Sequence, residues 1–159
     1  MPSSPPSDAR LRLIAESYRR LTGKPLLPEM PQDEDTLREA MWHAPFAIVA
    51  HGTEADPVFF YGNLYALRHF EMNFDEFARL PSRLSAEPVA QEAREEALAK
   101  VAQTGYIDGY SGMRVAKSGR RFMITDCTIW NLLDIEGKYH GQAALFVAQY
   151  PDHNQGETR

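Results

Sequence analysis

The spacing of apolar residues predicts two helices near the start of the chain. The first begins near Asp8, after which apolar side chains recur at intervals of three and four residues: Leu11, Ile14, Ala15 and Tyr18. Gly23 fits the left-handed position that ends many helices, and Pro25 prevents the helix from continuing. A second helix is predicted from about Asp33 to His43, with acidic residues at its positive end.

The rest of the pattern predicts strands on either side of a helical middle. Residues 45–51 and 58–62 are apolar runs separated by a polar turn, which is typical of a hairpin. Helical spacing returns between residues 63 and 105. Three longer runs rich in aromatic and β-branched residues follow, at 106–116, 121–134 and 139–150. This order predicts an α+β fold, in which an antiparallel sheet carries helices grouped on one face.

Proline content predicts the domain boundaries. Six of the 11 prolines lie within residues 1–35, so residues 1–32 are expected to form a tail, the first helix and a Pro-rich linker. Residues 33–150 are expected to form the domain, and residues 151–159 a disordered tail. The first helix either docks on its own domain or forms a dimer seam, because the prolines hold its exit extended. We expect a homodimer through this helix.

Charge and cysteine content limit the possible partners. The 17 Lys and Arg against 22 Asp and Glu give a net charge of −5, which argues against nucleic acid as the main partner. No apolar run approaches the ~18 residues of a membrane span, and the first residues lack the apolar core of a signal peptide. The single cysteine, Cys127, excludes an internal disulfide. We expect a cytoplasmic protein with no membrane partner.

Several segments of the sequence resemble a known kind of domain. An Asn directly after the second predicted strand matches the layout of a PAS domain. A narrower resemblance is carried by SYRRLTGKPLLP (17–28), APFAIVAHGTEADPVFFYGN (44–63), LPSRLSAEP (80–88), GYIDGYSGMRVAKSGRRFMI (105–124), WNLLD (130–134) and GQAA (141–144). These segments resemble the MEKHLA family, a PAS-like domain. The resemblance implies the stand-alone bacterial type of this domain. It also implies a five-stranded antiparallel sheet in the order 2-1-5-4-3 with helices over one face, and it implies no enzyme activity and no particular ligand.

A ligand cavity is expected between the inner face of that sheet and the helices of residues 64–104. Trp130 is the expected aromatic anchor, because it combines a large apolar surface with one N–H donor. Strict alternation along the fourth strand places Trp130 on one face with Phe122 and Ile124, and Cys127 and Ile129 on the other. The remaining expected ligand-binding residues are Tyr61, Asn63, Arg83, Tyr110 and Gln142. For Asn63, the alternative is a structural role as the cap of the following helix.

Other residues have weaker claims to chemistry. His51 and His140 lie at one end of neighbouring strands and are weak candidates for a metal or proton-sensing pair, the alternative being two polar strand-end residues. Cys127 lies in a strand, which argues against a covalent flavin adduct and favours an inert buried thiol. The helix of residues 88–104 has no histidine, which argues against haem; the cofactor stays unknown. Lys117, Arg120 and Arg121 form a basic hairpin tip, with Arg114 upstream; we interpret the tip as solvated, the alternative being a docking site for an anionic partner.

Three functions fit these patterns. The first is a sensory or ligand-binding module that holds a small molecule or a partner in the cleft between sheet and helices. The second is a small enzyme of isomerase or hydratase type, with Asp126 paired to a histidine. The third is a dimerisation adaptor without a ligand. We favour the first, because polar and aromatic side chains interrupt the apolar strand faces.

Overall fold

The computed structural model describes residues 5–150, so the tail expected at residues 151–159 lies outside the described residues. Within that range no helix is long and apolar enough to cross a membrane. The elements in chain order are α1 (Arg10–Thr22), α2 (Glu34–Trp42), β1 (Ala47–His51), β2 (Phe59–Gly62), α3 (Leu64–Phe70), α4 (Phe74–Phe77), the 3-10 helix η1 (Ser82–Ser85), α5 (Pro88–Thr104), β3 (Tyr106–Val115), β4 (Arg121–Leu133) and β5 (Tyr139–Gln149).

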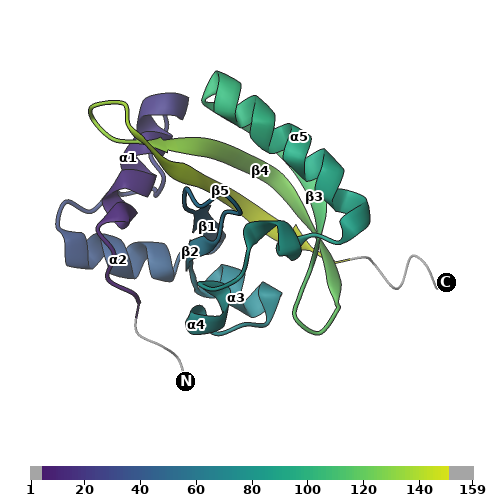
Figure 1. Cartoon of the computed structure of the whole chain (residues 1–159). Coiled ribbons are helices and arrows are strands. Elements are labelled where there is room, and N and C mark those ends of the chain that lie inside the picture. Colours follow the sequence, from purple (N-terminus) through teal and green to yellow (C-terminus); the bar gives the residue numbers. More distant parts are fainter. Residues whose placement is uncertain (1–4, 151–159) are drawn as a thin grey trace.

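The five strands form one antiparallel sheet in the order β2-β1-β5-β4-β3 (Figure 1). The first and last strands of the chain meet in its centre, where β1 pairs with β5 from Ala47 opposite Phe146 to His51 opposite Gln142. This arrangement confirms the expected α+β fold and the expected strand order. It also places the C-terminal end of β1 beside the N-terminal end of β5, so His51 and Gln142, which are far apart in the sequence, lie close together.

Helices cover both faces of the sheet, and β4 separates them. On one side, the Asn131 side chain donates a hydrogen bond to Val101 O of α5 at 3.1 Å. On the other side, the Trp130 indole N–H donates to Ile14 O of α1 at 3.2 Å, and the ring meets Tyr18 edge-on at 4.7 Å between centroids. Figure 1 shows α5 running alongside β3 and β4, with α1 crossing the end of β4 near the β4–β5 hairpin.

A β-bulge in the middle of β4 changes which side chains share a face. Asp126 has a φ of 51°, in the left-handed region that few residues other than glycine adopt. The pairing of β4 with β5 shifts between Thr125 and Thr128. Because a bulge adds one residue to its strand, the alternation reverses beyond it. Ile124 before the bulge therefore shares a face with Ile129 after it, which corrects the strict alternation expected from the sequence.

Helix α1 belongs to the core of this chain. Leu11, Ile14 and Ala15 are at most 4% exposed. The Ser17 hydroxyl donates to Leu133 O at 3.0 Å and accepts from Leu133 N–H at 2.9 Å, which fixes the helix to the backbone of β4. The buried residues of α1 therefore belong to the same core cluster as those of the sheet.

The Pro-rich linker folds back along α1. The Arg12 guanidinium donates to Pro31 O at 3.1 Å and to Gln32 O at 2.8 Å. Of the two alternatives for α1, the structure shows the first, in which the helix docks on its own domain. The apolar stripe that motivated the dimer seam is buried within the chain, and the homodimer stays a prediction.

We expect the substitution Ile14→Ala to lower the free energy of unfolding by about 2–5 kcal/mol, the usual cost of truncating a fully buried aliphatic side chain. Ile14 is 0% exposed. Urea denaturation followed by circular dichroism measures the change. Glu16→Ala, on the exposed face of the same helix, is the matched control and should stay within about 0.5 kcal/mol of the parent. Equal effects of the two substitutions would contradict the docked position of α1.

Candidate functional site

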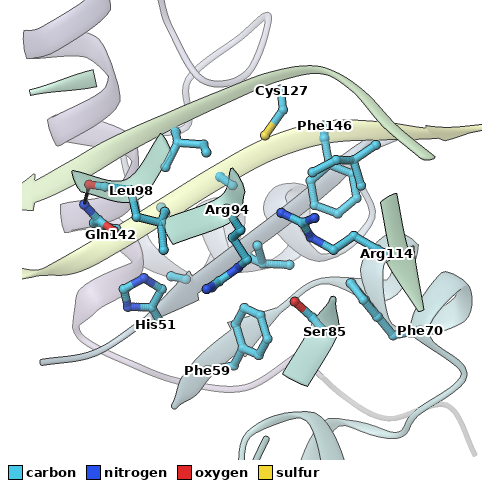
Figure 2. A pocket seen from close by; sticks show the side chains of 16 residues that line it. His51, Phe59, Phe70, Ser85, Arg94, Leu98, Arg114, Cys127, Gln142 and Phe146 are labelled. Atoms are coloured by element: carbon cyan, nitrogen blue, oxygen red, sulfur yellow. Dashed lines mark hydrogen bonds between the residues drawn. The ribbon is translucent and has the colours of Figure 1, made fainter. Parts of the chain in front are cut away.

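A cavity lies between the inner face of the sheet and the helices α3, η1 and α5 (Figure 2). About 50 Å³ of it is open to water-sized molecules, and the whole depression with its solvent-exposed mouth is about 470 Å³. Most of the wall is apolar, contributed by β1, β2, β4 and β5 and by α3 and α5. Its polar members come from five separate helices and strands and from the 3-10 helix η1: His51, Ser85, Arg94, Arg114, Cys127 and Gln142.

Two buried arginines enter this cavity from different elements. Arg94 comes from α5 and Arg114 from β3, and each residue is 6% exposed. Arg94 lies one and two helical turns before Leu98 and Val101, which places all three on the buried face of α5. Arg114 is brought inward by the alternation of β3. In Figure 2 both guanidinium groups reach toward the middle of the cavity.

The polar contacts of the two arginines are few. Arg94 donates to the Ser82 hydroxyl at 2.8 Å, and Arg114 donates to Met113 O at 2.8 Å. Burial, and after it the positive charge of Arg114, lower the pKa of Arg94 to about 10. Arg94 therefore remains charged at neutral pH, and the cavity contains two positive charges that repel each other.

His51 and Gln142 form one end of the cavity. The His51 Nδ1 lies 3.1 Å from Gly52 O, and a carbonyl oxygen only accepts, so this nitrogen carries the proton. His51 Nε2 is buried without a hydrogen-bond partner among the described residues. Gln142 donates to Leu98 O at 3.3 Å and to the Asn131 side chain at 3.1 Å. Burial lowers the pKa of His51, so its ring is neutral and Nε2 is a free acceptor at neutral pH.

Gln142 is the one predicted ligand-binding residue that lines this cavity. Trp130 lies on the opposite face of β4 under α1, which corrects its expected place as the cavity anchor; the reason is the bulge at Asp126. Tyr61 and Tyr110 are not in the wall. Tyr61 is 1% exposed and its hydroxyl has no partner within the described part of the chain. Arg83 points away and pairs with Asp56 at 3.0 Å.

Asn63 has its polar atoms fully occupied by the backbone. Its side-chain oxygen accepts from Ile48 N–H at 3.1 Å and from Ala66 N–H at 3.2 Å. Its amide group donates to Met41 O and to Phe46 O, both at 2.9 Å. Two donors and two acceptors are the whole capacity of this side chain, so none is left for a ligand. The structural alternative for Asn63 is therefore the one the structure supports.

The two candidate metal ligands have separate surroundings. His51 faces the cavity, whereas the His140 Nε2 lies 3.0 Å from the carboxylate of Asp134 in the β4–β5 hairpin. Among residues 5–150, no group of three or more His, Cys, Asp or Glu side chains is placed to hold a metal ion. Cys127 is 0% exposed in the cavity wall, and burial raises the pKa of its thiol to about 12, so it is a thiol at neutral pH.

Sequence reasoning missed both cavity arginines. Arg114 lies upstream of the basic hairpin tip and is buried, which its charge does not indicate. The three residues of the tip are exposed and each is paired with a carboxylate: Lys117 with Glu76, Arg120 with Glu71, and Arg121 with Glu87. One signal was available for Arg94. It shares helical spacing with Leu98 and Val101, so it falls on the apolar face of its helix.

The strand order and the helices over the inner face, with a cavity between them, define a PAS-like fold. Two solved structures have a similar fold, each with a TM-score of 0.61. One is a light-oxygen-voltage domain studied with a flavin analogue, at 18% identity over 76% of this chain and 90% of that one. The other is the PAS domain of a protein from Colwellia psychrerythraea, at 14% identity over 70% of this chain and 92% of that one.

Within this fold class, the chain belongs to the MEKHLA domain family, whose model matches residues 8–150. Similar curated proteins include the homeobox-leucine zipper protein HOX32 of Oryza sativa subsp. japonica, 28% identical over 150 residues, and ATHB-14 of Arabidopsis thaliana, 27% identical over 150 residues. Each match covers 92% of this chain but only 17% and 18% of those proteins. The similarity is thus confined to this one domain of much longer chains.

We expect Asn63→Ala to lower the free energy of unfolding by about 2–4 kcal/mol, because it leaves several buried backbone groups without partners. Asn73→Ala is the matched control. Asn73 caps α4 in the same way but on the surface, so its loss should cost about 1 kcal/mol. Chemical denaturation of both variants measures the difference. Equal costs would show that the buried network of Asn63 adds nothing to its role as a cap.

We expect the protein to lose stability as the pH falls below about 6.5, the ordinary pKa of histidine. The pKa of His51 is lowered by burial and by Arg94, with Glu54 acting in the opposite direction. Between the folded and unfolded pKa values the unfolded chain binds more protons, so acid favours unfolding. Thermal denaturation from pH 5 to pH 8, the range in which histidine usually titrates, measures this dependence.

His51→Gln should flatten this pH dependence, leaving the part due to His69, whose pKa is also lowered by burial. His43→Gln, at an exposed position, should retain the parent slope. An unchanged slope in His51→Gln would contradict the assignment.

Proposed function

We propose that this domain is a PAS-like sensory module that binds a small molecule in the cleft between the sheet and the helices. The observation that carries the proposal is the cavity itself. Its wall joins an apolar surface with a small number of convergent polar groups, which is the usual composition of a ligand site. The polar groups come from β1, η1, α5, β3 and β5, so a ligand there contacts most of the fold at once.

The size of the cavity limits the ligand. The space open to water-sized molecules, about 50 Å³, is well below the ~300–1,000 Å³ of pockets for drug-sized ligands, so an organic ligand would lie partly in the mouth of the 470 Å³ depression. A flavin ring system, named for the similar light-oxygen-voltage structure, does not fit this space. The cavity thiol also lies in a strand with its pKa raised, which does not suit the formation of an adduct. The proposal is therefore a small metabolite or ion.

The two alternative functions have less support. An enzyme would need a carboxylate and a histidine in contact within the cavity, and Asp126, the expected carboxylate, is exposed at the bulge. A ligand-free adaptor working through α1 would need an apolar face on that helix, and its apolar stripe is buried on β4. The proposed module acts in the cytoplasm without nucleic acid or membrane as partner, as its composition predicts.

The proposal predicts that the cavity binds at least one member of a panel of small anionic, neutral and cationic compounds. Native mass spectrometry of the purified protein detects a molecule that is retained during purification. Two-dimensional amide NMR with the panel detects weaker ligands, whose shifts should cluster on β1, β5 and α5. If no compound shifts these amides and none is retained, the proposal is wrong.

A cavity-filling variant tests the location of the binding site. Ala144 lines the cavity, so Ala144→Leu should occupy its space and abolish binding. Ala148 lies four residues further along β5 on the same face but outside the wall, so Ala148→Leu is the matched control and should retain binding. Circular dichroism confirms that both variants fold. Binding that survives Ala144→Leu would place the ligand elsewhere.

A further inference from the structure

The charges of the cavity are unbalanced. The wall contains two guanidinium groups, and among the described residues that form it none is acidic. The nearest carboxylate to Arg94 is that of Glu95 at 3.7 Å, and the side chain of Glu95 is 65% exposed, so water screens it. Arg114 has no ion-pair partner between residues 5 and 150. A buried charge without a counter-charge is costly, which makes this pair of arginines unusual for a structural core.

Both arginines also have unused donors. A guanidinium carries five N–H groups in a planar fork that matches the two oxygens of a carboxylate. Within residues 5–150, Arg94 donates one hydrogen bond to Ser82 and Arg114 donates one to Met113 O. Figure 2 shows the two guanidinium groups from α5 and β3 facing the same space, with His51 beside Arg94 and Phe146 beside Arg114. The remaining donors are therefore available to a ligand in that space.

The rest of the wall selects among anions. Apolar side chains line the wall around the arginines: Phe59, Phe70, Ile124 and Phe146. An inorganic phosphate or sulfate bound there would have oxygens facing this apolar surface, without water and without hydrogen bonds. A carboxylate with a short hydrocarbon or aromatic body satisfies both parts of the wall. Its oxygens meet the guanidinium groups, and its apolar body is buried against the ring side chains.

We propose that the cavity binds a small organic carboxylate through Arg94 and Arg114. This inference rests on the proposed function, since it specifies the class of ligand for the same cavity. The carboxylate supplies the missing negative charge, and the orphaned Nε2 of His51 accepts a hydrogen bond from a hydroxyl or N–H group of ligands that carry one. The ligand class thus follows from the two cations, the apolar rings and one free acceptor.

Sodium butyrate and sodium benzoate are suitable probes, with butyramide and benzamide as neutral counterparts of the same shape. Amide NMR titration at constant ionic strength should give saturable shifts around the cavity with the two carboxylates and much weaker ones with the amides. Sodium phosphate and sodium chloride, titrated in the same way, test whether the site binds inorganic anions. If phosphate or chloride binds as well as benzoate does, the site takes inorganic anions and the inference is wrong. Equal binding of benzoate and benzamide would also overturn it.

Substitution of Arg114 gives the sharpest test. Arg114→Met keeps the length and apolar stem of the side chain but removes its charge, and should weaken benzoate binding by about 10- to 100-fold. Arg114→Lys keeps the charge but loses the paired donors, so its benzoate affinity should lie between that of the parent and that of Arg114→Met. Arg83→Met, which removes an exposed arginine paired with Asp56, is the matched control and should leave benzoate binding unchanged. Unaltered binding in Arg114→Met would refute the inference.

The stability of the same variants without ligand separates binding from structure. Removing one of two repelling buried charges should leave the melting temperature of Arg114→Met equal to or above that of the parent in buffer without carboxylate. Benzoate should then raise the melting temperature of the parent and of Arg83→Met, but not that of Arg114→Met. A lower melting temperature of Arg114→Met without benzoate would assign Arg114 a structural role instead. If only neutral or cationic compounds bind, the carboxylate assignment fails while the ligand-binding function stands.

Discussion

The bulge at Asp126 determines which core each side chain of β4 enters. Helices cover β4 on both faces, so a single shift in alternation exchanges the side chains that face the cavity with those that face α1. With the bulge in place, Cys127 and Ile129 line the cavity and Trp130 packs against Tyr18 of α1. Without the bulge, strict alternation would place Trp130 on the same face of β4 as Ile124, which lines the cavity. The uncommon backbone conformation of Asp126 therefore decides which side chains of β4 belong to the cavity wall.

The polar side chains of the cavity differ from Asn63 outside it in how many hydrogen bonds the chain provides to them. Outside the wall, Asn63 has every polar atom satisfied, with four hydrogen bonds to the backbone. Inside the cavity, Arg94, Arg114 and His51 keep polar capacity that the chain does not use. Burying such groups reduces the stability of the fold, which proteins generally accept where a site binds something.

The sequence predicted local structure well where a single side chain determines it. Gly23 ends α1 in the left-handed conformation, and Asn63 caps the start of α3, both as their residue types predict. The strand order came from the family resemblance, because pairing between β1 and β5 joins residues almost a hundred positions apart. The bulge could not be predicted, because its left-handed residue is Asp126 and not the glycine that usually indicates such a conformation. The burial of Arg114 was missed because its charge, together with its basic neighbours, suggested a solvated turn.

The attachment of α1 also limits how this domain can diverge in sequence. The Ser17 hydroxyl donates to and accepts from the backbone of Leu133 with one atom, and Trp130 donates to a carbonyl of the helix. Shape-based substitutions elsewhere along α1 leave these bonds intact, whereas at position 17 only a residue with a hydroxyl can make both. An alanine or valine there could make neither bond: the Leu133 N–H would lose its side-chain partner, whereas Leu133 O would keep the hydrogen bond from Arg20. Evolution of this helix is therefore constrained by hydrogen-bond chemistry at one position, while its apolar positions remain free to exchange one hydrocarbon for another.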